Sequence, residues 1–301
     1  LLENIAGVYA PLLATGQVVV LPMQTVGFNG GRGFDIHALT TAISHYQPHS
    51  LILLPELLSA LLLAVNQGWQ PPESLRFIAV GGSRVAPQLI HDASKAGLPV
   101  FEGYGLSECS SVVSLNTPSS SLTGSSGNPL PHIRIKLEQG GIVVEGNAFL
   151  GYVGETDSWY PSYVDTGDMG SLDADGFLHI EGRRKNLLIS SFGRNINPEW
   201  IESEVLANPL IAQCIVLGDA RPYCVALIHP RHNLTTDADI ENWLQQVNRN
   251  LPDYAQIQRW QRLQHALNQQ NGMLTPNAKP VRDRITAFYQ NQIDQLYRES
   301  A

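Results

Sequence analysis

The sequence predicts an α/β protein in three parts: a doubly wound parallel sheet, a small β-barrel subdomain and a C-terminal α+β domain. Residues 1–115 alternate helical and continuous apolar patterns, which is typical of parallel strands covered on both faces by helices. Short alternating apolar runs follow in residues 116–184, and the pattern changes again after Lys185. We therefore place the parts at residues 1–115, 116–184 and 186–301.

The first part is expected to repeat a strand–helix unit. The expected helices are 2–13, 36–46, 55–66 and 87–96, and the expected strands are 17–21, 51–54, 76–80 and 99–101. Asp35 is expected to cap the second helix, because its carboxylate accepts hydrogen bonds from the first helical amides. Ligands of parallel sheets bind beyond the carboxyl ends of the strands, where Gly81-Gly82 and Tyr104-Gly105 are expected.

The middle part begins with residues 116–129, whose Ser, Thr, Pro and Gly content indicates a flexible connection. Residues 132–137 and 141–145 then alternate in polarity, which indicates a small antiparallel sheet or barrel. Residues 173–176 are expected to form a turn, because Asp173 tolerates turn geometry and Gly176 supplies a positive φ.

The last part is expected to be a compact α+β unit. The segment Asn197-Pro198-Glu199 indicates the start of a helix, with an N-cap, a first-turn proline and a first-turn acid. The expected helices are 198–207, 239–249 and 281–298, and the expected strands are 211–217 and 224–229.

Charge and cysteine usage disfavour several classes of protein. The 19 Lys and Arg residues against 27 Asp and Glu residues give a net charge of −8, which disfavours a nucleic-acid-binding protein. Cys109, Cys214 and Cys224 form no CxxC pair, so neither a disulfide framework nor a zinc site is indicated, and a cytoplasmic location is expected. The most apolar run, residues 51–65, is too short to span a bilayer, so no transmembrane segment is expected.

Three short motifs contain the residue types of a nucleotide-dependent enzyme. They are Tyr104-Gly105-Leu106-Ser107-Glu108, Thr166-Gly167-Asp168 followed by Arg183, and Leu274-Thr275-Pro276 followed by Lys279. Taken singly, each motif is also typical of a structural turn or of an exposed turn with positively charged side chains. Together and in this order they resemble the adenylate-forming superfamily, which contains acyl-CoA synthetases, luciferases and the adenylation domains of peptide synthetases.

The resemblance implies an adenine site in the first part of the chain. Gly81, Gly82 and Ser83 would flank the adenine, with small residues that permit a close approach of the backbone. Tyr104, followed by Gly105, would stack its ring near the same base.

The resemblance also assigns the polar groups around the ribose and the phosphates. Ser107 stands where the family usually has Thr, and its hydroxyl would contact a phosphate. Glu108 would help to hold Mg²⁺, a hard cation that prefers oxygen ligands. Asp168 would bind both ribose hydroxyls, because a carboxylate accepts two hydrogen bonds. Arg183 would contact the ribose and a phosphate.

The resemblance gives the last part of the chain a second set of roles. Lys279 would stabilise the negative charge that develops as pyrophosphate leaves; it is followed by Pro280, where the family more often has another apolar residue. Lys185 would be the hinge about which the C-terminal domain swivels. Gly193 and Arg194 would lie beside the pantetheine thiol after that movement.

The implied function is that of an AMP-forming acid:thiol ligase. A carboxylic acid and ATP would give an acyl-adenylate, and the acyl group would pass to CoA. The implied cofactors are ATP/AMP, Mg²⁺ and CoA or phosphopantetheine. Two alternatives stay open: an adenylation enzyme that loads a carrier protein, and a non-catalytic remnant that serves as an interaction module. A nucleotide-binding dehydrogenase is disfavoured, since no GxGxxG lies between a strand and a helix.

The family's Ser/Thr/Gly-rich phosphate loop has no counterpart in the sequence. Residues 30–33 are glycine-rich but lack the Ser/Thr run, and residues 123–129 contain no Lys and follow the Tyr104 motif instead of preceding it. We therefore expect the chain to be the later part of a longer family member and to be inactive in adenylation by itself.

Overall fold

The computed structural model describes residues 5–28, 34–275 and 278–298, so the glycine-rich residues 30–33 lie outside the described residues. The chain divides into two compact units, Leu1–Glu181 and Gly182–Ala301. The further division of the first unit at residue 115 stays a prediction.

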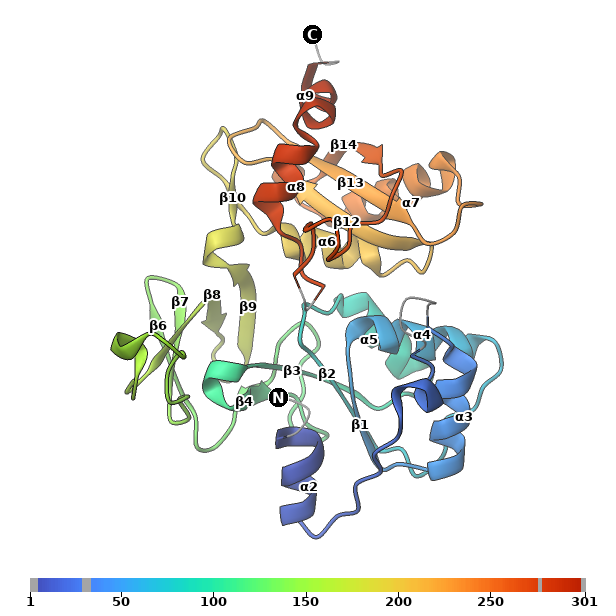
Figure 1. Cartoon of the computed structure of the whole chain (residues 1–301), viewed down its shortest axis with the longest axis vertical. Coiled ribbons are helices and arrows are strands. Elements are labelled where there is room, and N and C mark those ends of the chain that lie inside the picture. The colour runs from blue at the N-terminus through green and yellow to red at the C-terminus, as the bar shows by residue number, and fades with distance from the viewer. Residues whose placement is uncertain (1–4, 29–33, 276–277, 299–301) are drawn as a thin grey trace. The chain divides into compact units, whose positions relative to one another are not determined.

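The first unit is built on a sheet of order β1-β2-β3-β4-β5, in which the first three strands are parallel. The strands are β1 (Ser50–Leu53), β2 (Phe77–Val80), β3 (Val100–Leu106), β4 (Ser111–Leu115) and β5 (Asn128–Pro129). The helices beside it are α3 (Ile36–Tyr46), α4 (Pro55–Asn66) and α5 (Pro87–Lys95). Figure 1 shows these helices next to one another along the sheet. The parallel α/β core predicted from the alternating pattern is therefore confirmed.

Local chemistry explains where these helices begin. The Asp35 carboxylate accepts from the amides of His37 and Ala38, at 2.9 and 3.4 Å, and caps α3 as expected. Pro55 and Pro87 each stand in the first turn of α4 and α5, where a missing N–H costs no helical hydrogen bond. These helix starts lie within the boundaries that the sequence predicted.

The strand expected at residues 17–21 is wrong, because these residues belong to no helix or strand in the structure. Residues 2–4 of the preceding predicted helix lie outside the described residues, and the rest is helical as predicted, with a π-helix at Ile5–Tyr9 and α2 at Ala10–Leu13. A 3₁₀ turn (Met23–Val26) comes after residues 17–21. Val20 is 78% exposed. An apolar run becomes a strand only where a neighbouring strand pairs with it, and within the described residues this run has no paired neighbour.

The remainder of the first unit, where a small β-barrel was expected, is an antiparallel meander of order β6-β7-β8-β9, and within the described residues this sheet does not close into a barrel. The strands are β6 (Arg134–Glu138), β7 (Gly141–Glu145), β8 (Val164–Leu172) and β9 (Leu178–Arg183). Two short 3₁₀ turns, Ser107–Cys109 and Thr156–Ser158, lie near it in sequence. Its buried side chains Ile142, Val144 and Leu178 share one cluster with Leu106 and Val113, which joins the meander to the end of β3.

The second unit is built on the sheet β12-β13-β14, with β12 antiparallel and β14 parallel to β13. The strands are β10 (Leu188–Ile189), β11 (Asn195–Ile196), β12 (Ile211–Leu217), β13 (Cys224–Pro230) and β14 (Ile257–Arg262). The helices are α6 (Pro198–Leu206), α7 (Asp237–Asn250), α8 (Arg282–Phe288) and α9 (Gln290–Arg298), with 3₁₀ turns at Arg184–Asn186 and Asp253–Ala255. Figure 1 labels these strands and helices, apart from β11.

The two faces of this sheet bury alternate residues of the same strands. Val216 and Ala226 pack with residues of α6 and α7 on one face. Leu217 and Val225 pack with Ile285 and other residues of α8 and α9 on the other face. This alternation follows from the period of two residues in a β-strand, and it confirms the predicted α+β unit.

The single terminal helix expected at 281–298 is divided into α8 and α9. The chain leaves helical geometry at Tyr289, where φ is −96° and ψ is 15°. Ile285 in α8 and Ile293 in α9 are both buried in the same cluster. The predicted helical segment is therefore confirmed, with one interruption at residue 289.

The three cysteine thiols are buried and free. Burial raises the pKa of Cys109 to about 12 and that of Cys224 to about 11, and it raises the pKa of Cys214 well above its ordinary value. Across the described ranges, no helix is both long enough and apolar enough to cross a bilayer.

Candidate active site

The sequence suggested that Tyr104 and Gly105 lie beyond the carboxyl end of a strand. In the structure both residues lie inside β3. The strand continues to Leu106 because β4 folds back and pairs with it, and Tyr104 is opposite Ser114. A Cβ atom on Gly105 would stand 2.0 Å from the carbonyl oxygen of Ser111, so only glycine fits this crossing of the two strands. The motif therefore spans the last residues of a strand and the turn that follows.

Tyr104 contacts Asp168, a residue 64 positions later in the sequence. The tyrosine hydroxyl donates to Oδ2 of Asp168 at 2.6 Å. Asp168 is only 4% exposed, and its own amide donates to the hydroxyl of Thr166 at 3.1 Å. That hydroxyl in turn donates to the carbonyl of Ile142 on the neighbouring strand. The structure thus brings two of the sequence-predicted site residues together and fixes both on strands.

Glu108 is held from the loop that connects β7 and β8. It lies in the 3₁₀ turn after β3, where its carbonyl accepts from the amide of Phe149 at 2.8 Å. Its carboxylate accepts from the hydroxyl of Tyr152 at 2.9 Å. Ser107, beside it, is exposed. The sequence analysis missed Tyr152, because the loop between β7 and β8 has neither a periodic pattern of apolar residues nor a motif that would indicate this contact.

The Gly81-Gly82-Ser83 segment directly follows β2, at the carboxyl end of a parallel strand as predicted. A Cβ atom on Gly81 would stand 2.7 Å from the carbonyl oxygen of Gly103 on β3. Gly82 has a φ of 81°, in the region that favours glycine, and both Gly82 and Ser83 are exposed. Glycine is therefore required here by packing and by backbone geometry, whatever binds beside it.

The second unit presents Lys279 on a hairpin. Leu274 and Pro280 form a bridge, the amide of Thr275 donates to the Lys279 carbonyl at 2.8 Å, and the Lys279 amide donates to the Thr275 hydroxyl at 3.1 Å. Pro276 of the predicted motif lies outside the described residues. The Lys279 side chain is exposed, so its ammonium is held by the backbone beneath it and not by burial.

The other predicted residues of the second unit lie between the end of β9 and the start of β11. Arg183 is the half-buried last residue of β9, and Lys185 is exposed in the 3₁₀ turn Arg184–Asn186. Gly193 has a φ of 73° in the turn between β10 and β11. The guanidinium of Arg194 lies over the ring of Tyr254, 5.8 Å from its centre.

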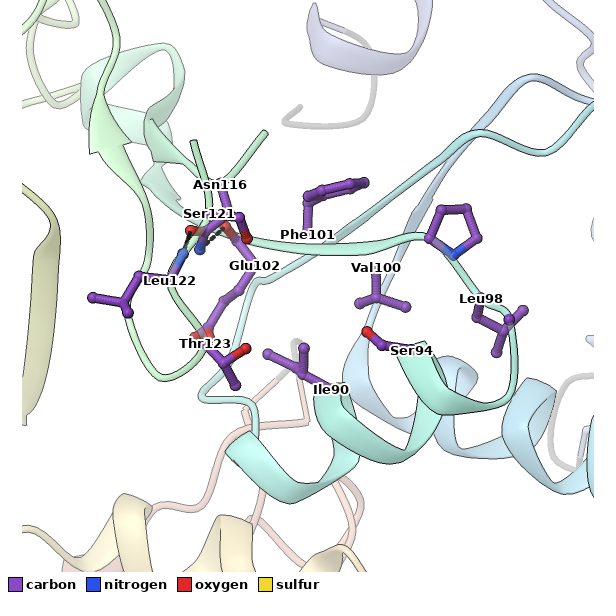
Figure 2. Close-up of a pocket in the computed structure, with 12 residues that line it drawn as sticks. Ile90, Ser94, Leu98, Val100, Phe101, Glu102, Asn116, Ser121, Leu122 and Thr123 are labelled. Carbon is purple, nitrogen blue, oxygen red and sulfur yellow. Dashed lines mark hydrogen bonds between the residues drawn. The ribbon is translucent and has the colours of Figure 1, made fainter. Parts of the chain in front are cut away.

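Glu102, which sequence reasoning did not single out, lines a pocket of about 370 Å³ between α5, β3 and residues 116–123. Figure 2 shows its side chain extending from β3 toward Thr123. Burial raises the pKa of Glu102 to about 8, although the nearby positive charge of Arg84 acts in the opposite direction. A sequence signal was present but weak, since an acid two residues before Tyr104 interrupts an apolar strand.

Glu102 makes the stability of the chain depend on pH. Because its pKa in the folded chain is raised from 4.5 to about 8, the folded state binds the proton more tightly than the unfolded state. The free energy of unfolding should therefore fall as the pH rises through this window. Glu102→Gln cannot ionise, so it should gain stability relative to the wild-type chain over the same window.

Urea unfolding of both chains at the two ends of that window measures the difference. Glu138→Gln, which removes a carboxylate at an exposed position, is the matched control. If Glu102→Gln and the wild-type chain differed in free energy of unfolding by the same amount at both pH values, a raised pKa of Glu102 in the folded chain would be contradicted.

Comparison with known proteins covers both units. The pattern of the AMP-binding enzyme family matches residues 2–154, and that of the AMP-binding enzyme C-terminal domain matches residues 185–301. Long-chain-fatty-acid–CoA ligase FadD15 of Mycobacterium bovis is 30% identical over 248 residues, which are 73% of this chain and 41% of that protein. 2-Succinylbenzoate–CoA ligase of Bacillus velezensis is 33% identical over 225 residues, 69% of this chain and 45% of that protein.

Solved structures show the same fold. O-succinylbenzoate coenzyme A synthetase from Bacillus subtilis, in complex with AMP, superposes with a TM-score of 0.73 at 24% identity, over 94% of this chain and 58% of that chain. The same enzyme in complex with ATP and a magnesium ion gives equal values. The chain thus spans only about half the length of the proteins it matches. With one family pattern over its first half and the matching C-terminal pattern over its last part, the chain belongs to the AMP-binding enzyme family.

Proposed function

We propose that the whole protein containing this chain is an AMP-forming acid:thiol ligase. The observation that supports this most directly is the hydrogen bond between Tyr104 and Asp168. It unites two motifs that are distant in sequence into one polar site beside the Gly81-Gly82 turn. A structural turn or a decayed remnant has no need of this pairing, because neither residue closes a turn there.

In the first unit, we assign nucleotide binding to the residues around this pair. The ring of Tyr104 would stack on adenine, flanked by Gly81, Gly82 and Ser83, and the Asp168 carboxylate would accept from the ribose hydroxyls. Asp168 is already almost withdrawn from water, so a ribose would meet a group whose orientation is fixed by its neighbours.

The residues present also fit a magnesium ion that arrives with a nucleotide. Among the described residues, no group of three or more His, Cys, Asp or Glu side chains could hold a metal ion by itself. Mg²⁺ commonly uses one or two carboxylates and completes its shell with water and substrate phosphates. Glu108, oriented by Tyr152, would supply such a carboxylate, and Ser107 would supply a hydroxyl to the phosphates. When bound, the ion would neutralise phosphate charge.

In the second unit, we assign the two half-reactions to different surfaces. Lys279 would place its positive charge near the α-phosphate and the reacting carboxylate during adenylation. Gly193 and Arg194 would face the thiol during acyl transfer, and Arg183 would contact the ribose and a phosphate. Lys185 would be the hinge between these two arrangements.

CoA is favoured over a carrier protein as the acyl acceptor, because the relatives compared above are named as CoA ligases. The acids named for those relatives differ widely, so the class of carboxylic acid is left to experiment. The three unpaired thiols support a reducing compartment, and we place the protein in the cytoplasm.

The test is pyrophosphate release by the whole protein with ATP, Mg²⁺ and a panel of aliphatic and aromatic acids. Asp168→Ala should raise the KM for ATP by about 10- to 100-fold, as expected from the loss of two hydrogen bonds to a charged group. Asp175→Asn, in an exposed turn of the same unit, is the control. ATP binding without pyrophosphate release for any acid would instead support the non-catalytic remnant.

A further inference from the structure

A buried ionic cluster joins α6, β12 and α8 in the second unit. Nη2 of Arg282 donates to both carboxylate oxygens of Glu202, at 2.9 and 2.7 Å, and Nη1 donates to the carbonyl of Val216 at 3.0 Å. Glu202 also accepts from the amide of Val216 at 2.7 Å. The side chains are 13% and 8% exposed, so this contact is largely shielded from water. Three elements are thus fixed at one point.

This point lies three residues after Lys279. Between the two residues, Pro280 has a φ restricted to about −65°, and the amide of Val281 donates to the carbonyl of Met273 at 2.9 Å. Met273 itself is buried in the cluster around Ile285. The base of the Lys279 hairpin is therefore held by the backbone and by buried side chains. Because Arg282 is the first residue of α8, its bonds fix the orientation of the hairpin relative to that helix.

The cluster also reaches the proposed hinge turn. Glu199 lies three residues before Glu202 on the same face of α6, with its Oε1 at 4.0 Å from Nη2 of Arg282. That same oxygen accepts from Nδ2 of Asn186 at 2.5 Å. Asn186 directly follows Lys185, so one set of contacts links the turn at the hinge with the base of the Lys279 hairpin.

We propose that Arg282 is a positioning residue for adenylation, which holds the Lys279 hairpin in register with the hinge turn through Glu202 and Glu199. This inference rests on the proposed function. An apolar pair would hold α6 against α8 equally well, because buried ion pairs are often no more stabilising than well-packed hydrophobic residues. The hydrogen bonds of Arg282 to two carboxylate oxygens and a carbonyl are directional, so they also fix the orientation of α8 relative to α6 and β12. An apolar contact would not do so.

The first test uses the double variant Glu202→Met/Arg282→Met in the whole protein, which removes both charges and so leaves neither one buried and unpaired. Adenylation should fall by about 100-fold, as expected when a catalytic group is misplaced by about 1 Å. Transfer from a supplied acyl-adenylate to CoA should stay at the wild-type rate. Arg249→Met, which removes an exposed arginine from the last turn of α7, should change neither half-reaction.

The second test measures the hairpin without any assay of activity. Hydrogen exchange at the amides of Thr275 and Lys279 should become faster in the double variant, while exchange in β13, which has no hydrogen bond to either substituted side chain, stays unchanged. If the double variant does not fold, Arg282→Lys keeps the charge and should shift both measurements in the same direction by less.

Two results would overturn the proposal: equal loss in both half-reactions, or hairpin amides that exchange at the wild-type rate in a folded variant. The exchange measurement applies even if no acid is adenylated. A failure of the proposed function is therefore distinguishable from a failure of the positioning role.

Discussion

Lys279→Ala should slow adenylation by roughly 100- to 1,000-fold, while transfer from a supplied acyl-adenylate to the thiol continues at nearly the wild-type rate. The expected loss is that of one charged contact made in the transition state. The hairpin itself should survive the substitution, because its hydrogen bonds use the backbone of Lys279 and the hydroxyl of Thr275. Pyrophosphate release and acyl-CoA formation, followed separately in the whole protein, measure the two rates.

Lys95→Ala is the control for this experiment, since it removes an exposed ammonium from the end of α5 and should leave both rates unchanged. Equal loss in both half-reactions of Lys279→Ala would show that Lys279 maintains the structure of the second unit. It would then have no specific role in adenylation.

Lys185→Pro should abolish acyl transfer and preserve adenylation. Lys185 is exposed within the 3₁₀ turn Arg184–Asn186, and the φ of proline is compatible with such a turn. Folding should therefore tolerate the change, whereas the large φ and ψ changes of a hinge should not be accessible. The two half-reactions of the whole protein, measured separately, report the result.

Lys185→Ala is the matched control, because it removes the same side chain and leaves the backbone free to rotate. Acyl transfer at the wild-type rate in Lys185→Pro would place the pivot at another residue. The turn at 184–186 would then serve only to connect β9 with the second unit.

Local signals in the sequence were sufficient for most helices and strands. Asp35 and Asn197 cap their helices as predicted, because a capping side chain contacts amides only two or three residues away. The parallel strands of the first unit were visible as continuous apolar runs. Membership in the family was readable for the same reason, since each motif is a short run of neighbouring residues.

Contacts between residues that are distant in the sequence could not be predicted from these local signals. The run at 17–21 resembles a strand, yet strand formation depends on a partner that composition does not reveal. The strand β14 was missed because its sequence is largely polar and its pairing with β13 is what makes it a strand. The contact from Tyr152 to Glu108 and the cluster around Arg282 join residues 44 and 80 positions apart, and no local pattern encodes them.

The burial of all three cysteines makes the chain suitable for site-specific fluorescent labelling. Maleimide dyes react with thiolates, and raised pKa values leave almost no thiolate on Cys109, Cys214 or Cys224 near neutral pH. A cysteine introduced at an exposed position of each unit would then be modified without first removing the native ones. Energy transfer between two such dyes, one on each unit, would test directly whether the second unit rotates relative to the first.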